Sequence, residues 1–371
     1  MWHRRRHDQG TIRWRLNSVA GPSLRRTMPH IPAMAYSLSV LDQSPIPAGS
    51  DAAAALRNTI DLARACDALG YERYWLAEHH ASPALAGAAP EVMIGPVVLA
   101  TQRIRVGSGG IMLPHYSPFK VAETFALLSA LAPGRIDLGL GRAPGSDQRT
   151  AIALQRDRSR LMPNDFPAQL GELAGYLDQS LPDDHAFAAL QHTLPAGGGR
   201  PDVWMLGSSP DSARWAAEWG MPYCIADFIN PDGAPLAQSY RARFQPSVHL
   251  AAPRVMVATW AIAADSADAA DRLAAPSRMM FAHLVAGRLI AVPPVDEAVA
   301  WLAANPDAAR HRRRMTLGTA HDVHRQLDTL AADYGADEVM LVNILPDHAA
   351  RRRSYELVAA EYGLARSAVA A

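Results

Sequence analysis

The chain has 371 residues, of which 49% are hydrophobic and 19% charged, and it carries no net formal charge. This composition supports a large buried core in one big domain or two medium ones, and it excludes disorder as the main state. No apolar run approaches the roughly 18 residues that cross a bilayer, so we expect a soluble protein. The two cysteines, Cys66 and Cys224, can form neither a disulfide framework nor a CxxC metal site, which predicts the cytoplasm as the location.

Residues 1–33 form a basic leader with seven arginines and a single acidic residue. The rest of the chain holds 29 basic and 35 acidic residues, a net charge of −6, and so lacks the basic face that drives nucleic-acid binding. The leader has no apolar segment of a secretory signal and resembles a transit peptide only loosely. We expect a disordered tail or an over-long start assignment, with a targeting segment as the alternative, followed by a single domain over residues 34–371.

Short β-like runs alternate with longer helical patterns along this domain. Strands are expected at 38–41, 73–76, 104–113, 135–140, 203–206, 223–226, 254–263 and 338–342. Helices are expected at 51–69, from 90, and at 118–131, 210–219, 234–243, 267–275, 320–334 and 348–362. Eight strands that alternate with helices predict an α/β fold, most economically a (β/α)8 TIM barrel, with a doubly wound open sheet as the alternative.

Two stretches interrupt this alternation and are expected to be insertions. The first, at about 142–200, follows the fourth strand, and the second, at about 276–316, precedes the eighth and contains Pro293 and Pro294. Loops after the carboxyl ends of barrel strands build the active site, so the first insertion is a candidate lid. The alternative for both insertions is a solvated excursion that packs on the outer helices.

Polar residues gather where the predicted strands end, and His79 and His80 are the candidate catalysts among them. Adjacent residues in an extended segment point to opposite faces, so at most one of the two histidines should face the pocket. Glu78, His79 and His80 could instead bind a metal, but no second histidine cluster and no HExxH motif accompany them. A serine hydrolase would carry a GxSxG motif, which is absent. We therefore predict neither a metal site nor a hydrolase.

The segment LGSSPDSA predicts a strand end followed by a capped helix. Helix amino termini with free amides and hydroxyls bind phosphate, so Ser208, Ser209 and Ser212 are candidate phosphate ligands, and Gly207 lets the anion approach the backbone. The alternative is an ordinary helix cap without a ligand.

Glycines within two other predicted strands indicate room for a ligand. Gly109 and Gly110 interrupt an apolar strand, which indicates a bulge or the close approach of a planar ring, with a barrel-corner kink as the alternative. Gly141 follows the next predicted strand. The glycines there do not have the spacing of a GxGxxG dinucleotide-binding motif, so we interpret Gly141 as leaving room for a ligand. Arg142 could pair with a ligand phosphate or form a surface salt bridge.

The order of these motifs resembles the luciferase-like flavin-dependent monooxygenases, in particular a subgroup without assigned substrates. The resemblance runs through SVLDQSP, RYWLAEHH, IRVGSGGIMLPHYSPFKVAE, GRIDLGLGRAPGSD, LGSSPDSA, WAAEWGMPYC and DHAARRRSYELVA. It implies a (β/α)8 barrel, usually a homodimer, that binds reduced FMN, often supplied by a separate flavin reductase. Such an enzyme would activate O2 through a C4a-peroxyflavin and oxygenate a small organic substrate.

The resemblance also implies roles for the candidate residues. His79 matches the histidine near the flavin C4a position, and His80 matches a neighbour of less certain purpose. Gly109 and Gly110 match a non-proline cis peptide under the flavin ring. The phosphate site corresponds to Arg142 with the three serines, and Ser208 replaces a glutamate of luciferase itself.

Two departures and two alternatives follow from the same resemblance. Gly141 stands where luciferase has a reactive cysteine, so we do not predict bioluminescence. Asp227 stands where we expect a histidine in close relatives, so the substrate side of the pocket should differ. A related barrel uses the deazaflavin F420 for hydride transfer, and degenerate relatives bind flavin without catalysis. The organic substrate is not predicted, because variable loops supply the pocket side chains.

Overall fold

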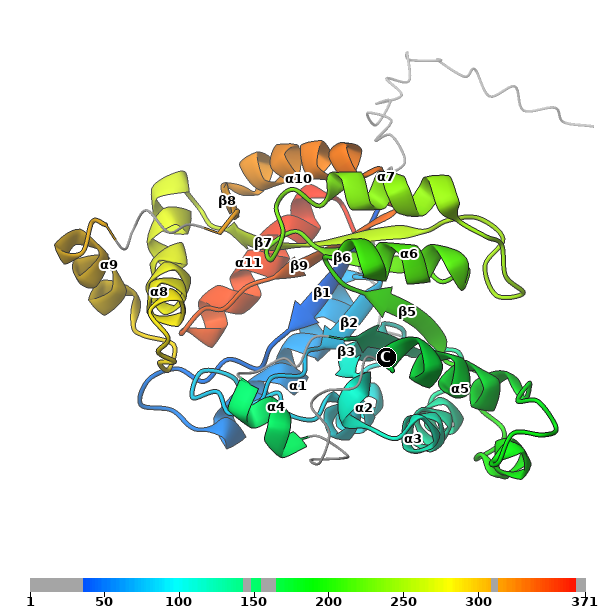
Figure 1. The fold of residues 1–371 in the computed structure, drawn as a ribbon. Coiled ribbons are helices and arrows are strands. Elements are labelled where there is room, and N and C mark those ends of the chain that lie inside the picture. The colour runs from blue at the N-terminus through cyan, green and yellow to red at the C-terminus, as the bar shows by residue number, and fades with distance from the viewer. Residues whose placement is uncertain (1–35, 143–147, 155–164, 308–312, 365–371) are drawn as a thin grey trace, which may run out of the picture. The chain divides into compact units, whose positions relative to one another are not determined.

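The computed structural model describes residues 36–142, 148–154, 165–307 and 313–364, within a compact unit that spans Ala35–Ala371. The expectations for the leader at residues 1–33 lie outside the described residues. Eight parallel strands close into a barrel (Figure 1), because β1 pairs with both β2 and β9 and β6 pairs with β7. The TIM barrel is thus confirmed and the open sheet is excluded. The barrel strands are β1 (Ser37–Asp42), β2 (Arg73–Leu76), β3 (Arg105–Met112), β4 (Ile136–Gly141), β5 (Asp202–Leu206), β6 (Tyr223–Ala226), β7 (Val255–Ala263) and β9 (Glu338–Val342).

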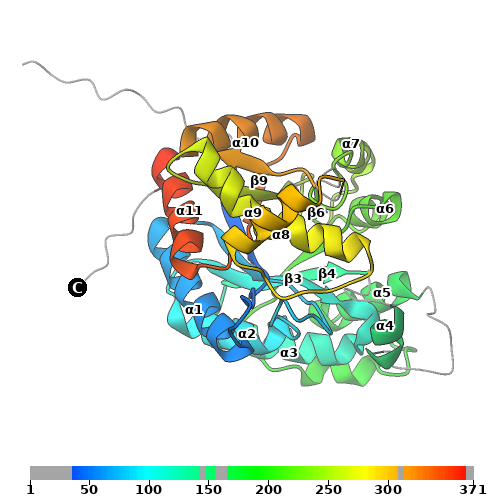
Figure 2. The same ribbon diagram turned by 90° about the vertical axis from the view of Figure 1, so that its left-hand side faces the viewer.

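Helices surround the barrel, and Figure 2 shows α8 and α9 lying in front of this ring. The ring consists of α1 (Ala52–Leu69), α2 (Pro90–Ala100), α3 (Pro118–Leu131), α5 (Phe166–Asp178), α6 (Pro210–Glu218), α7 (Ala234–Arg243), α10 (Ala320–Tyr334) and α11 (His348–Glu361). Local signals set several ends: the Asp51 side chain accepts a hydrogen bond from Ala54 N at 2.7 Å, and Gly70 ends the same helix with φ +93°. No helix among the described residues is long and apolar enough to span a membrane.

A buried ionic cluster closes the amino-terminal end of the barrel. Arg73 on β2 donates to Asp137 on β4 at 2.8 Å and to Glu338 on β9 at 3.0 Å. The Arg73 guanidinium also lies 5.1 Å from the ring centroid of Trp204 on β5. These side chains fill the interior between the strands at this end, so we look for the functional site at the carboxyl ends.

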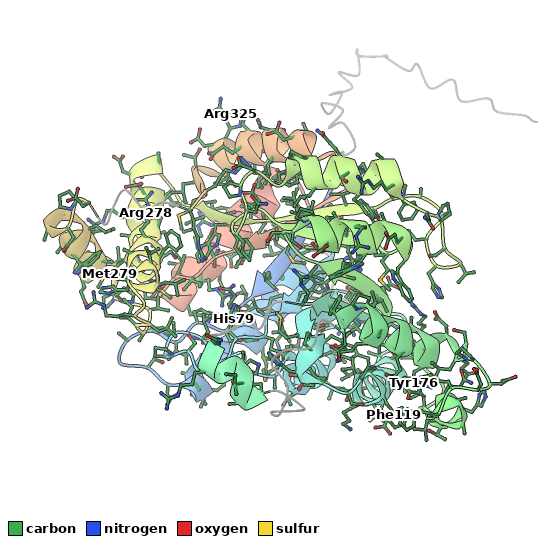
Figure 3. All side chains as sticks on the ribbon, viewed as in Figure 1. His79, Phe119, Tyr176, Arg278, Met279 and Arg325 are labelled. Carbon is green, nitrogen blue, oxygen red and sulfur yellow. The ribbon has the colours of Figure 1, made fainter. Side chains whose placement is uncertain are left out.

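Residues 165–200 of the first insertion pack on the outside of the barrel. The insertion contains α4 (Gln148–Leu154), α5 and a 3-10 helix at Ala188–Thr193. Tyr176 on α5 packs against Phe119 on α3 with ring centroids 5.1 Å apart, and both are labelled in Figure 3. Phe166 on α5 packs against Trp215 on α6 at 5.2 Å. The expectation of a lid is therefore wrong for residues 165–200, and residues 143–147 and 155–164 lie outside the described part.

The second insertion differs from its prediction in two ways. Helix α8 (Ala267–Val285) continues through Pro276, although an interior proline costs about 3 kcal/mol. Packing on both sides of the helix offsets this cost. Ala274 packs with Ile262 of β7, and Ala275 packs with Ala298 of α9 (Val295–Ala304). A short strand, β8 (Thr316–Gly318), then pairs with the end of β7 outside the barrel. The three residues of β8 are too few to show an alternating pattern, so the sequence did not predict this strand.

Candidate functional site

Two adjoining cavities lie at the carboxyl ends of the barrel strands. The first, the glycine-serine cavity, has a volume of about 300 Å³ and is lined by all of the predicted site residues except His80. The second, the apolar cavity, has about 560 Å³ and is lined by α8 and by the segments before and after α9. The residues that line both are Gln43, His79, Phe228 and Ile229. Among the described residues, the second insertion thus borders the apolar cavity, and the first insertion contributes Arg142 to the glycine-serine cavity.

The floor of the glycine-serine cavity is a glycine bulge in β3. Gly109 and Gly110 are joined by a cis peptide bond, as the resemblance implies, and the register of β3 with β4 shifts between Ser108 and Ile111. A Cβ on Gly109 would lie 2.7 Å from Leu41 Cδ1, and one on Gly110 would lie 2.7 Å from the carbonyl oxygen of Gly139. A side chain at Gly110 would overlap backbone and one at Gly109 would displace Leu41, so the backbone itself forms this wall.

The serine segment forms the cap of α6, and its three hydroxyls differ in what they contact. Ser209 Oγ accepts a hydrogen bond from Ser212 N at 3.3 Å and lies 3.3 Å from Ser212 Oγ. Ser212 Oγ donates to the carbonyl oxygen of Ser209 at 2.8 Å and lies 3.0 Å from the hydroxyl of Tyr223. Ser208 Oγ has no hydrogen-bond partner among the described residues. Ser212 also lines the cavity, and its assignment to the phosphate stays a prediction.

Gly207 and Arg142 complete this end of the cavity. A Cβ on Gly207 would lie 2.5 Å from Ser212 Oγ, so a side chain there would displace the cap. Arg142 forms an exposed ion pair with Asp211 on the first turn of α6, at 3.1 Å, and its guanidinium lies 5.2 Å from the ring centroid of Trp215. An exposed pair contributes at most about 1 kcal/mol, so an anion at the cap can compete for this guanidinium.

His79 stands where the two cavities meet, on the side of the barrel that faces α8 (Figure 3). Its Nδ1 is buried and has no hydrogen-bond partner among the described residues. Burial, reinforced by the nearby charges of His80 and Arg313, lowers the pKa of His79 to about 4. The imidazole is therefore neutral at pH 7, with a ring nitrogen free for a ligand.

His80 lines only the apolar cavity, together with His79. Its Nε2 lies 2.8 Å from Glu78 Oε1, and the other carboxylate oxygen of Glu78 accepts from Met112 N at 2.9 Å. The expectation that at most one histidine faces a pocket is wrong, because both line the apolar cavity and β2 already ends at Leu76. Strand alternation does not apply after that point.

Two further residues differ from what the sequence indicated. Asp227 does not line either cavity, because its buried carboxylate is held by Arg314 and by the hydroxyl of Tyr334. Arg313, which lies in the second insertion, lines the apolar cavity, although the sequence analysis did not name it as a site residue. Within the described ranges, no three His, Cys, Asp or Glu side chains gather as metal ligands would.

The chain is similar to several known proteins. Residues 36–342 match the family described as luciferase-like monooxygenase. The luciferase-like monooxygenase of Escherichia coli K12 is 40% identical over 325 residues, which cover 86% of this chain and 95% of that protein. The crystal structure of apo-MsnO8 has a TM-score of 0.81 at 38% identity and covers 90% of this chain and 99% of that one.

A more distant structure shares the fold alone. It is the oxygenating constituent of 3,6-diketocamphane monooxygenase from Pseudomonas putida, a type II Baeyer-Villiger monooxygenase in complex with FMN. Its TM-score is 0.66 at 18% identity, and it covers 88% of this chain and 97% of that chain.

Proposed function

Because the chain belongs to the luciferase-like monooxygenase family, we propose that it is a flavin-dependent monooxygenase that uses reduced FMN and O2 to oxygenate a small organic molecule. The observation that carries this proposal is the glycine-serine cavity. It combines a side-chain-free wall at Gly109 and Gly110, hydroxyl donors at a helix cap, and a neutral histidine with an unpartnered nitrogen.

The chemistry of the lining fits FMN. Phosphate is bound by helix amino termini, hydroxyls and guanidinium groups, which here are the first turn of α6, Ser208, Ser209 and Arg142. A planar ring needs a flat apolar wall, which the two glycines and Ala226 and Ala258 provide. We therefore assign the serine end to the phosphate and the glycine end to the isoalloxazine ring.

The residues of this chain would contribute positioning, proton transfer and the exclusion of water. Reduced FMN, when bound, supplies the electrons for the reaction with O2. Neutral His79 can take up or return a proton at Nδ1, which faces no partner among the described residues. Phe228 and Ile229 line both cavities and would keep water from the reacting atoms.

An anaerobic titration tests the cofactor. Reduced FMN should bind at least about 10-fold more tightly than reduced riboflavin, which lacks the phosphate. Equal affinities would contradict the phosphate assignment. Tighter binding of F420, without O2 consumption, would replace this function with hydride transfer. Binding of FMN with no turnover of reduced flavin would instead indicate a storage protein.

The proposal also includes two partners that the resemblance implies, a separate flavin reductase and a second copy of this chain. Light scattering on the purified protein tests the homodimer. Oxidation of NADH in the presence of free oxidised FMN tests the need for a reductase, because this chain alone should oxidise no NADH.

A further inference from the structure

Arg313 is a half-buried cation in the wall of the apolar cavity. Its guanidinium lies 4.4 Å from the ring centroid of Phe281 on α8, and it forms no ion pair with any residue that the structure describes. Two other arginines nearby are paired: Arg314 with Asp227 at 2.6 Å, and Arg278 with Asp271 at 2.7 Å. Arg313 is thus the arginine of this group for which the described residues supply no counter-ion.

The cavity around Arg313 supplies no negative charge. None of the described residues that line it is acidic, and its walls are mostly apolar, with Met280, Leu284, Leu289, Ile290 and Met315 among them. A cation withdrawn from water and left unpaired costs several kcal/mol. Burial lowers the pKa of Arg313, and its charge contributes to the lowered pKa of His79, so the charge reaches the proposed reaction centre.

We propose that Arg313 binds an anionic group of the substrate, and that the substrate is an apolar molecule carrying one carboxylate. This inference rests on the proposed function and names its substrate class. The carboxylate would meet the guanidinium, and the apolar part would lie along α8 and the segment before α9, within reach of His79. Arg313 is then a specificity-determining residue.

The arrangement favours a carboxylate over a phosphate. A single guanidinium matches the two oxygens of a carboxylate, whereas a dianion needs further donors. Arg278 is the other arginine in this wall, and Asp271 already holds it. The hydroxyls at the cap of α6 line only the glycine-serine cavity. The two cavities therefore offer different anion sites.

Calorimetric titration of the flavin-free protein with octanoate, 1-octanol and octylamine tests the proposal. These probes have the same chain length and differ in charge. Octanoate should bind at least about 10-fold more tightly than octanol, and octylamine should not bind. Equal affinity for octanoate and octanol would overturn the proposal.

Substitutions locate the charge. Arg313→Met should remove the preference for octanoate, and Arg313→Lys should retain part of it. Arg325→Met is the matched control, because Arg325 lies on α10, is exposed and lines neither cavity (Figure 3). Octanoate binding that survives in Arg313→Met, with a melting temperature like that of the wild type, would refute the assignment. If Arg313→Met does not fold, Arg313→Lys decides: an undiminished preference for octanoate over octanol in that variant refutes it.

Titration with reduced FMN, carried out on the same samples, separates the two hypotheses. FMN binding without any preference for octanoate would overturn the substrate class and leave the monooxygenase proposal standing. A preference for octanoate that depends on Arg313, without FMN binding, would support the anion site and remove the proposed function.

Discussion

Arg314 holds the buried carboxylate of Asp227 with two hydrogen bonds, 2.6 Å from Nη2 to Oδ1 and 3.0 Å from Nε to Oδ2. The hydroxyl of Tyr334 donates to the same carboxylate at 2.9 Å. These contacts join the end of β6 to the segment before β8 and to α10. They therefore fix Phe228, the next residue, which lines both cavities.

The first prediction concerns this pair. Arg314→Ala should lower the free energy of unfolding by about 3 kcal/mol, because it leaves a buried carboxylate without its cation. Asp227→Asn should cost less, since the amide oxygen can still accept from Tyr334. Urea denaturation measures both, and a loss below about 1 kcal/mol for Arg314→Ala would show that the pair is not needed for stability.

Ser208 and Ser209 should separate binding from stability. Ser209→Ala removes the cap of α6 and should lower the free energy of unfolding by about 1 kcal/mol, whereas Ser208→Ala should change it by less than about 0.5 kcal/mol. Each should weaken FMN binding by about 10-fold or more and leave riboflavin binding unchanged. Flavin fluorescence titration provides the measurement. Weaker riboflavin binding would mean that the ring, not the phosphate, had been disturbed.

Gly207→Ala should disrupt the same end of the cavity by a steric route. The new Cβ would lie 2.5 Å from Ser212 Oγ, so the cap must move and FMN affinity should fall by about 10-fold or more. The matched control is the same change in a Ser212→Gly background, where the overlapping atoms are gone. In that background Gly207→Ala should lower the FMN affinity only slightly further. A loss of FMN affinity as large as in the wild-type background would show that the clash is not with Ser212.

The stability of the protein should depend on pH through His79. Its pKa is about 4 in the folded chain and 6.5 in the unfolded chain, so the unfolded chain binds more protons between these values. The contribution of neutral His79 to the free energy of unfolding is complete above about pH 6.5 and is lost as the pH falls toward 4. Between pH 7.5 and 4.5 we expect a loss of about 2 kcal/mol that His79→Gln does not show. Urea denaturation of both proteins, with the exposed His192→Gln as control, measures the difference.

Local signals in the sequence predicted most of the fold. The eight barrel strands and the capped helices follow from periodicity and from residues such as Asp51, Gly70 and Pro210, whose effects are confined to neighbouring residues. The gathering of Gly109, Arg142 and Ser209 around one cavity follows from the barrel itself, because strand ends meet at one rim.

Long-range contacts explain what the sequence did not predict. The continuation of α8 past Pro276 depends on packing against β7 and α9, and the place of Asp227 depends on Arg314, 87 residues away. Arg313 and Arg314 are adjacent in the chain, yet one lines a cavity and the other is paired. No pattern in a single sequence distinguishes them.

The two cavities are built from different stretches of the chain. The wall assigned to the cofactor comes from β3, β4 and the start of α6, whereas the wall opposite it comes from α8 and the residues around α9. Evolution can therefore exchange the second stretch to accept new molecules while the oxidising machinery is inherited intact. A protein engineer who wishes to redirect this scaffold should randomise positions between 277 and 315 and leave the glycines and serines alone.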